Sequence, residues 1–421
     1  MTRKVIAMVL AGGMVPALNI LSQRRAKAAI PFGGIYRIID FVLSNLMNSR
    51  INIIGILTQY KPSSLMDHVG IGAPWDFIGR TRYVRILPPY KGEVDSDWYR
   101  GTADAVYQNI NFIEDHHPDY VLVLSAEHIY TMNYSPVIDF HISKKADCTI
   151  VCKKLPVLNP SRFGILAMDE DGKVLRYEEK PQVPKGNYYS LGIYVFNTPF
   201  LLERLQEDAE QKDSSHSFAY NIIPNLVGKY RLYAYPFTGT WEYCGTIDEY
   251  WKLHMDLLKD QPEIDLWNWS VRTNLEDRNI GDRSPARCDP SAEVINSLIS
   301  PGCLIRGRVE RSVLSPGVVV EKDAVVRDSV IMHDTQIGTG ALVDRVVADK
   351  DVLIGAHAVV GTGDPQVANL SYPSYFHTGI TVLGKGAEVE DHIQIGRNCL
   401  IHPGIVVSKS KYSEIPSGRT L

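Results

Sequence analysis

Two features near the N-terminus are suited to binding phosphate: a glycine turn and a group of cations. The apolar run Val5–Leu10 leads into Gly12–Gly13, which is typical of a buried parallel strand that opens into a glycine turn. Backbone N–H groups in such a turn can approach a phosphate. Arg24, Arg25 and Lys27 follow shortly afterwards and can pair with the same anion. A Gly-Gly pair alone also fits an ordinary tight turn, but with these cations it favours a nucleotide site.

The glycine turn continues into an Arg-Ala-Lys cluster at 25–27 and a Phe-Gly-Gly segment at 32–34. Together these motifs resemble the signature of the sugar-1-phosphate nucleotidyltransferases, most closely that of the glucose-1-phosphate adenylyltransferase family. Members of that family read L-A-G-G-x-G-x-R-L, then R-A-K-P-A and F-G-G-x-Y/F-R-I-I-D-F. The resemblance extends over nearly the whole chain. It implies ATP or another nucleotide and glucose 1-phosphate as ligands.

The resemblance places the nucleotide around the glycine turn. It assigns a catalytic role to Lys27 and nucleotide binding to Leu10, Ala11, Gly12, Gly13, Gln59, Gly101 and Thr102. The loop departs from the family pattern after its second glycine. Val15 stands where the family has a third glycine, and Ala17 replaces the arginine that holds the triphosphate. These replacements predict that catalysis is weakened.

The family holds a divalent metal with two carboxylates. The first is the aspartate of L-S-G-D-H-I-Y, which is Glu127 here, and the second is the aspartate of W-R-D-V-G-T, which is Tyr243. Glu242 is adjacent, but an offset of one residue in an extended segment points a side chain to the opposite face. The resemblance therefore implies Mg²⁺, while the residues predict a lost or weakened site in which Glu127 is the remaining catalytic and metal-binding carboxylate.

The sugar-phosphate half follows the family more closely. The resemblance assigns sugar-phosphate binding to Tyr99, Gly164, Glu179, Lys180, Ser190 and Trp241. In this reading Glu179 binds sugar hydroxyls and Lys180 pairs with the phosphate as a point charge. One departure concerns the family motif H-D-F-G-K-D, in which the sugar-binding aspartate is Ser217 here.

Two arginines match positions near an anionic effector site in the family. They are Arg24 and Arg37, and the resemblance implies an anionic metabolite as their ligand. Arginines at these positions could equally pair with carboxylates at a subunit interface. The family also implies a tetramer, either of this chain alone or with a catalytic homologue.

Composition narrows the class of protein. The chain has 421 residues, 45% of them apolar and 22% charged, which is typical of a globular protein of two or three domains. Its net charge of −4 argues against a nucleic-acid partner. No apolar run approaches the roughly 18 residues of a membrane span, and the N-terminus lacks a signal-peptide pattern, so we expect a cytoplasmic protein. The six cysteines have no paired Cys-x-x-Cys spacing, which predicts reduced thiols and no zinc site.

Residues 1–275 alternate strand-like and helical stretches, which predicts an α/β, Rossmann-like nucleotidyltransferase domain with a mostly parallel sheet. The clearest strands are Val5–Leu10, Asn52–Leu57, Tyr120–Leu124, Cys148–Cys152 and Gly192–Phe196. Ligands bind such sheets at the carboxyl ends of the strands. We place the linker at residues 276–291, which are polar and contain Pro285 and Pro290.

Residues 292–421 follow a period of six. The aliphatic residues that are six apart are Val313, Val319, Val325, Ile331, Ile337 and Val343, and then Val389, Ile395 and Ile401. One inward aliphatic residue per hexapeptide predicts a left-handed parallel β-helix, in which each repeat forms one face of a triangular coil. The stretch Gly363–Tyr375 breaks the period and is expected to be a loop.

Three functions fit these observations. The first is a regulatory subunit of ADP-glucose synthesis for glycogen, catalytically silent or weak, that modulates an active adenylyltransferase. The second is an active enzyme that makes ADP-glucose through a rearranged site. The third is a sugar-phosphate or nucleotide sensor or scaffold without such a partner. The number of replaced catalytic residues favours the first.

Overall fold

The computed structural model describes residues 3–13, 15–90, 98–156, 159–277 and 280–421, and the chain divides into two compact units. Unit 1 contains residues up to Gly13, Phe41–Pro62 and Val69–Trp241. Unit 2 contains Met14–Asp40, Ser63–His68 and Glu242–Leu421. Among the described residues, no helix is long and apolar enough to cross a membrane.

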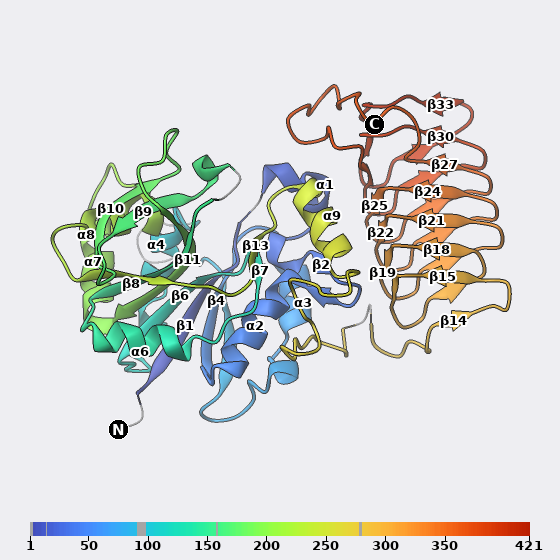
Figure 1. The fold of residues 1–421 in the computed structure, drawn as a ribbon. Coiled ribbons are helices and arrows are strands. Elements are labelled where there is room, and N and C mark those ends of the chain that lie inside the picture. Colours follow the sequence, from blue (N-terminus) through green and yellow to red (C-terminus); the bar gives the residue numbers. More distant parts are fainter. Residues whose placement is uncertain (1–2, 14, 91–97, 157–158, 278–279) are drawn as a thin grey trace. The chain divides into compact units, whose positions relative to one another are not determined.

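Unit 1 is built on a nine-stranded sheet (Figure 1). Its strands are β1 (Val5–Leu10), β4 (Ile53–Leu57), β5 (Tyr83–Leu87), β6 (Tyr120–Ser125), β8 (Cys148–Lys154), β9 (Gly164–Met168), β10 (Val174–Glu179), β11 (Tyr188–Asn197) and β12 (Leu232–Pro236). The short strand β7 (His128–Tyr130) follows β6. β1 pairs in parallel with β4 and β6, and β4 with β5, which confirms the predicted parallel arrangement around the glycine turn. β11 runs antiparallel to β6, β8 and β9, so this side of the sheet is mixed.

The helices of unit 1 pack on both faces of this sheet. They are α4 (Thr102–Tyr107), α5 (Ile110–Glu114), α6 (Ser135–Ser143), α7 (Thr198–Ala209) and α8 (Ile223–Leu226), with a π-helix at Phe218–Ile222 and 3₁₀ helices at Ala73–Trp75 and Pro160–Arg162. α2 (Ile38–Asn48) and α3 (Ser63–Val69) each contribute residues to both units. Because side chains alternate along a strand, Ile6 and Met8 of β1 pack in one core with Val106 of α4 and Leu201 of α7. On the opposite face, His141 of α6 hydrogen-bonds Thr149 of β8.

Unit 2 contains the N-terminal insertion and the C-terminal repeats. The insertion comprises 3₁₀ helices at Pro16–Leu18 and Lys27–Ala29, α1 (Ile20–Gln23), β2 (Pro31–Phe32) and β3 (Tyr36–Arg37). β13 (Trp241–Tyr243) then leads into α9 (Ile247–Asp256). Thr246 caps α9, since its hydroxyl accepts a hydrogen bond from the Glu249 N–H at 3.2 Å. The Glu249 carboxylate in turn accepts one from the Gly245 N–H at 2.9 Å, which anchors the chain that leaves β13.

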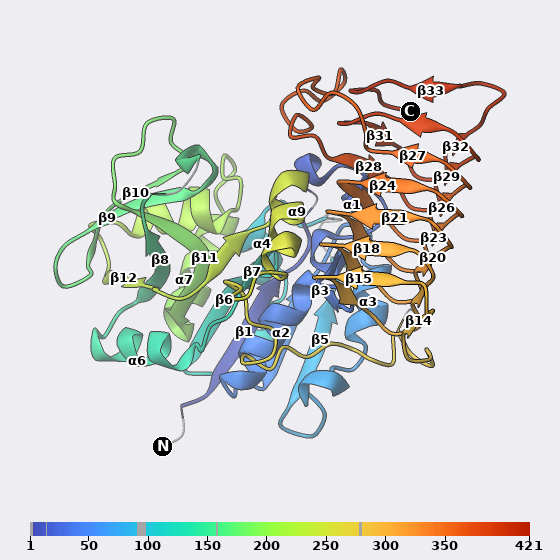
Figure 2. The ribbon, with the colours of Figure 1, turned by 45° about the vertical axis from the view of Figure 1, so that its right-hand side comes forward.

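The repeats form a left-handed β-helix of three parallel sheets, visible as three columns of short arrows in Figure 2. The first column holds β14 (Arg287–Cys288), β17 (Leu304–Ile305), β20 (Val319–Val320), β23 (Gln336–Ile337), β26 (Leu353–Ile354), β29 (Glu388–Val389) and β32 (Val406–Val407). The second holds β15 (Glu293–Ile295), β18 (Arg308–Glu310), β21 (Val325–Arg327), β24 (Leu342–Asp344), β27 (Val359–Val360), β30 (Gln394–Ile395) and β33 (Glu414–Ile415). The third holds β16 (Leu298–Ile299), β19 (Val313–Leu314), β22 (Val330–Ile331), β25 (Val346–Ala348), β28 (Thr381–Leu383) and β31 (Leu400–Ile401).

The predicted ladder was wrong in register for part of its length. Val320 and Val326 are fully buried, whereas Val319 and Val325, which were predicted to point inward, are only partly buried. Leu314 continues the inward row. The pairing of Val326 with Val343 shows that this coil has 17 residues. Two of its three repeats therefore have six residues and one has five. A strict period of six loses the register of the inward residues at the shorter repeat.

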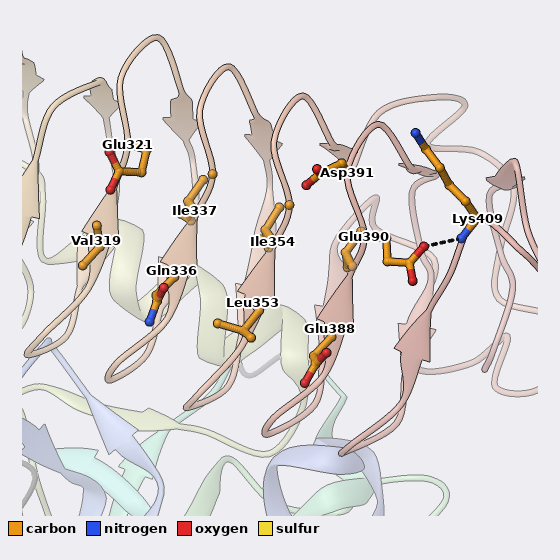
Figure 3. Close-up of a pocket in the computed structure, with 13 residues that line it drawn as sticks. Val319, Glu321, Gln336, Ile337, Leu353, Ile354, Glu388, Glu390, Asp391 and Lys409 are labelled. Atoms are coloured by element: carbon orange, nitrogen blue, oxygen red, sulfur yellow. Dashed lines mark hydrogen bonds between the residues drawn. The ribbon is translucent and has the colours of Figure 1, made fainter.

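The outward face of the first column is visible in Figure 3, where Val319, Gln336, Leu353 and Glu388 follow one another from coil to coil. The loop between β27 and β28 confirms the predicted break in the repeat. It is anchored by the buried Asn369, whose amide donates to the Asn398 carbonyl at 2.9 Å. All six cysteines are free thiols, as predicted.

The C-terminal residues cover the backbone edge of β31. The Leu400 N–H donates to the Arg419 carbonyl at 2.9 Å, and the Leu421 N–H donates back to the Leu400 carbonyl at 2.9 Å. The His402 N–H donates to the Leu421 carbonyl at 2.7 Å. Residues 419–421 therefore occupy the edge of β31 to which a further strand would pair.

Candidate functional site

A cavity of about 450 Å³ lies in unit 1 where β1, β4, β6 and β11 end or bend, a size suited to a small-molecule ligand. Of the residues assigned from sequence, those that line it are Leu10, Gly12, Gly13, Gln59, Tyr99, Gly101, Thr102, Glu127, Glu179 and Lys180. Ala11, Gly164, Ser190 and Trp241 do not line it. Lys27, Arg24 and Arg37 belong to unit 2 and are described within that unit.

The glycine turn is held against the end of β4. The Ala11 N–H donates to the Leu57 carbonyl at 2.8 Å, and the Gly12 carbonyl accepts a hydrogen bond from the Tyr60 N–H at 3.4 Å. A β-carbon on Gly12 would come within 3.2 Å of the Gln59 nitrogen, so a larger residue would crowd this strand end. The turn is therefore held close to the end of β4 at Ala11 and Gly12.

The carboxylate of Glu127 packs directly against Gly13. A β-carbon on Gly13 would overlap Glu127 Oε1, so the acid occupies the space beside the glycine. An anion held there repels a phosphate that approaches the same backbone, because like charges at contact distance in a cavity interact strongly. The longer side chain at this position thus reaches over the glycine turn.

The polar wall beside the turn is a hydrogen-bonded network. The Tyr99 N–H donates to Gln59 Oε1 at 2.6 Å, and the Tyr99 hydroxyl donates to the Leu87 carbonyl at 3.0 Å. Burial raises the pKa of Tyr99 to about 12, so this hydroxyl stays protonated at neutral pH. Thr102 fixes the next segment, because its hydroxyl accepts a hydrogen bond from the Phe218 N–H at 3.0 Å.

Gly101 allows two backbone segments to touch. A β-carbon there would lie 2.3 Å from the carbonyl oxygens of both Ser215 and His216. The Ala103 N–H donates to the His216 carbonyl at 2.8 Å, which joins the start of α4 to this segment. The backbone that precedes Ser217 is thereby fixed against the cavity wall.

Glu179 is positioned for hydrogen bonding to a ligand. Its Oε2 accepts a hydrogen bond from the Tyr177 hydroxyl at 2.8 Å, and burial raises the pKa of Glu179. A β-carbon on Gly164 would lie 2.6 Å from Glu179 Oε2, so only glycine leaves room for the acid.

Lys180 is half-exposed and has a φ of 49°, a left-handed conformation that is uncommon for lysine and is found at functional sites. Its Nζ lies 4.0 Å from Glu179 Oε1 and 5.9 Å from the centre of the Tyr220 ring. The charge is thus held at the cavity, where it can pair with a phosphate.

Trp241 and Ser190 were predicted to bind the sugar phosphate but do not line the cavity. Trp241 is 4% exposed and packs against the rings of His128, Phe163 and Tyr189. The Ser190 hydroxyl accepts a hydrogen bond from the Gly192 N–H at 3.3 Å. Ser190 thus fixes Gly192, which lines the cavity, whereas the three rings that pack against Trp241 do not line it.

The sequence analysis did not assign several residues that line the cavity. They are Leu57, Ala105, Ser125, Gly192, Tyr194, Ser217, Phe218, Ala219 and Tyr220. Gly192 carried a usable signal, because an isolated glycine inside a strand indicates a bulge. It has a φ of 69°, and the pairing of β11 with β8 shifts between Ser190 and Tyr194.

In unit 2, Lys27 is 1% exposed, and its Nζ lies 5.1 Å from the centre of the Tyr243 ring. An ammonium group over an aromatic face is stabilised by a cation–π interaction. The side chain at the family's second metal-binding position therefore offers a ring to Lys27 where the family has a carboxylate.

The donor set does not fit a Mg²⁺ ion. Glu127 packs on Gly13, and Tyr243 carries a phenol in place of the second acid. Within the described part of the chain, no group of three or more His, Cys, Asp or Glu side chains could hold a metal. Mg²⁺ prefers several oxygen ligands in an octahedral arrangement, which these residues do not supply.

Arg37 is buried, and its Nη2 lies 2.6 Å from Asp277 Oδ2. Its Nη1 donates to the carbonyl and the hydroxyl of Ser64 at 2.8 and 2.7 Å. Arg24 is exposed at the end of α1. Arg37 therefore has a carboxylate partner in its own chain, while Arg24 faces solvent.

His68 lies between two carboxylates in this cluster. Its Nε2 is 2.6 Å from Asp40 Oδ1, and its Nδ1 is 3.0 Å from Asp277 Oδ2. Burial lowers the pKa of His68, but the two carboxylates raise it by more, so the net pKa lies above 6.5. Burial, together with Arg37 and Arg25, lowers the pKa of Lys350 to about 7.

These shifts predict a pH-dependent stability. The folded chain holds the His68 proton more tightly than the unfolded chain, so its stabilising effect is complete at low pH and is lost as pH rises through the folded-state pKa. The lowered pKa of Lys350 has the opposite effect above pH 7. We therefore compare two proteins: the difference in free energy of unfolding between wild type and His68→Gln is expected to shrink as the pH rises above about 6.5. A gap that does not change with pH would contradict the charged state of His68.

Comparison with known proteins agrees with this architecture. A family model described as nucleotidyl transferase matches residues 6–260, and a model described as GlmU-like, C-terminal hexapeptide matches residues 285–383. A glucose-1-phosphate adenylyltransferase from Thermomicrobium roseum is 45% identical over 422 residues, which cover 99% of this chain and 97% of the relative. The chain belongs to the glucose-1-phosphate adenylyltransferase family.

Other relatives carry the same name. The glucose-1-phosphate adenylyltransferase of Fervidobacterium nodosum is 42% identical over 409 residues, covering 96% of this chain and 97% of the relative. That of Acetivibrio thermocellus is 40% identical over 423 residues, covering 100% and 98%. Membership of the glucose-1-phosphate adenylyltransferase family confirms the resemblance seen in the glycine turn and in the hexapeptide repeats.

Proposed function

We propose that this chain is a regulatory subunit of ADP-glucose synthesis for glycogen, with weak or lost catalysis of its own, that modulates an active glucose-1-phosphate adenylyltransferase in the cytoplasm. The observation that carries this proposal is the Glu127 carboxylate on Gly13, where the nucleotide phosphates need an open glycine turn. Val15, Ala17 and Tyr243 support it, since each replaces a residue that the family uses for phosphate or metal.

The proposed ligands follow from the two sides of the cavity. Glu179 and Lys180 keep the geometry for a sugar phosphate, so we propose that glucose 1-phosphate binds there. ATP or another nucleotide would use the glycine turn only after the Glu127 side chain moves. We propose Arg24 and Arg37 as part of an anionic effector site, where an effector must compete with Asp277 for Arg37.

The oligomer that we propose is a tetramer, either of this chain alone or of this chain with a catalytic homologue. The domain boundaries, with a linker at 276–291, also stay a prediction.

The test compares pyrophosphate release from ATP and glucose 1-phosphate by the chain alone, by a catalytic homologue alone and by their mixture. We expect negligible turnover by the chain alone and a changed effector response of the homologue in the mixture. Light scattering of the mixture should show a hetero-tetramer. A mixture that behaves as the sum of its parts would contradict the regulatory role and leave a sensor or scaffold.

A second candidate is an active enzyme that makes ADP-glucose and pyrophosphate from ATP and glucose 1-phosphate. The relatives favour it, because they are named glucose-1-phosphate adenylyltransferase and match over almost the whole chain. Ordinary turnover by the chain alone would establish this candidate in place of the first.

Glucose 1-phosphate binding depends on Lys180 in both candidates. Lys180→Ala is expected to weaken binding about tenfold or more, because one charge-assisted contact to phosphate contributes about 1.5 to 3 kcal/mol. Titration calorimetry measures it without turnover. Lys154→Ala is the matched control, since this exposed lysine at the end of β8 does not line the cavity. Equal affinities for the two variants would place the phosphate elsewhere.

A further inference from the structure

Unit 1 has a second cavity, of about 500 Å³, at the opposite end of its parallel strands. Val5 and Ile53, the first residues of β1 and β4, form part of its lining. The carboxyl ends of the same strands, at Leu10 and Leu57, line the cavity described above. In Figure 1 this end of β1 is the one nearer the N label. Six residues of β1 separate the two ends by about 17 Å, so one small ligand cannot reach both cavities.

The second cavity is strongly cationic. Arg3, Lys4, Arg50 and Arg80 line it, and Asp139 is its carboxylate. The Arg3 guanidinium lies 2.8 Å from Asp139 Oδ1, so this pair neutralises itself.

The other three cations that line this cavity are Lys4, Arg50 and Arg80. Among the residues that the structure describes, no ion pair is formed by the side chains of Lys4, Arg50 or Arg80. Arginines elsewhere in the chain are neutralised, for example Arg25 by Asp349 and Arg327 by Asp344. A chain with a net charge of −4 thus gathers three uncompensated positive charges around one hollow.

A helix C-terminus accounts for the position of only one of these three cations, Arg50. Arg50 follows α2 with a φ of 58°, and cations are favoured at helix C-termini. Lys145 follows α6 in the same way, with a φ of 49°, but lines no cationic cavity. Lys4 precedes a strand and Arg80 lies in a loop, so neither is placed by a helix dipole.

We propose that this cavity binds a small metabolite that carries two or more phosphate groups. Guanidinium groups match phosphate oxygens through paired N–H donors, and the ammonium of Lys4 adds a point charge. The cavity has the volume of a small-molecule site. Val5 and Ile53 add apolar surface for the carbon skeleton of the ligand. Because the cavity lies at the far end of β1 and β4, it is separate from the first cavity, and its lining includes neither Arg24 nor Arg37.

The test is titration calorimetry of the full chain with a hexose bisphosphate at fixed ionic strength. The variant R50E/R80E is expected to raise the dissociation constant at least about tenfold, because two attractive charges become repulsive. K145E/K154E is the matched control: it makes the same change in net charge, includes a helix C-terminus, and is expected to keep the wild-type affinity. R24A is also expected to keep it.

Thermal melting without ligand checks that R50E/R80E folds, and R80E alone gives a second variant in an exposed loop. A loss of affinity in R80E that is smaller than the loss in R50E/R80E supports the site. Unchanged affinity in R50E/R80E, or equal losses in R50E/R80E and K145E/K154E, would overturn the proposal. Binding that disappears in R24A but not in R50E/R80E would also overturn it, since the ligand would then occupy the other arginine site.

Discussion

Turnover of ATP and glucose 1-phosphate by the isolated chain is expected to be about a thousandfold or more below that of a family member with an intact loop. Removal of one preorganised electrostatic contact commonly costs about 3 to 4 kcal/mol of transition-state stabilisation, which is about 10² to 10³ in rate. Here Val15, Ala17 and Tyr243 replace three family residues, and Glu127 covers Gly13. Such losses are not additive, so we set the expected loss near the upper end of the effect of one contact and not at the product of three.

Restoring the family residues at these positions tests the prediction more sharply than measuring the loss of turnover. The combined variant Val15→Gly, Ala17→Arg, Glu127→Asp and Tyr243→Asp is expected to recover measurable pyrophosphate release. The shorter acid clears Gly13, the glycine and the arginine restore the phosphate contacts, and the second acid restores a metal ligand. Glu127→Asp alone is the control, since it clears the turn without adding a cation. Recovery in the single variant would show that steric blockage by Glu127 accounts for the loss, and no recovery in the combined variant would contradict the role of these four positions.

Loss of the buried Arg25–Asp349 pair is expected to have the largest effect on stability. Arg25 Nη2 lies 2.8 and 2.9 Å from the two oxygens of Asp349, and the two side chains are 4% and 0% exposed. Asp349→Ala leaves an uncompensated guanidinium inside unit 2, and breaking a buried pair in this way typically costs about 3 to 5 kcal/mol. The measurement is the urea midpoint of unfolding with an unchanged slope.

The control for this variant lies two residues away. Asp351 is 51% exposed and lies 3.4 Å from Lys385, so Asp351→Ala is expected to cost less than about 1 kcal/mol. A double variant, Arg25→Met with Asp349→Leu, should recover part of the loss, because it removes both charges. Equal midpoints for Asp349→Ala and Asp351→Ala would show that the buried pair contributes little.

The sequence predicted the parallel core of unit 1 because Val5–Leu10 and Ile53–Leu57 are short, continuous apolar runs, the pattern of a strand buried on both faces. It did not predict that β9, β10 and β11 extend the sheet in antiparallel fashion, since strand direction depends on pairing partners far apart in the chain. The β-helix was predicted from its period, but its register was not. Val319 and Val320 are neighbours in one strand and lie on opposite faces, so a shift of one residue in a coil exchanges them. A valine at either position looks the same in sequence.

Site residues were predicted where a motif fixed the backbone and missed where tertiary packing placed them. Glu179 and Lys180 line the cavity as expected. The contact between Glu127 and Gly13 joins two strand ends that are more than a hundred residues apart, and no local pattern carries it. Tyr194 and Tyr220 reach the cavity through a strand bulge and a π-helix, which single-sequence patterns rarely signal.

The C-terminal cover on β31 has a consequence for shortened forms of this protein. A β-helix ends in an open ladder of N–H and C=O groups, which is a template for strand addition by another molecule. Arg419 and Leu421 cover the part of that ladder that β31 forms, through backbone hydrogen bonds to Leu400 and His402. Removing residues 419–421 would expose the backbone edge of β31 and favour strand addition by another molecule.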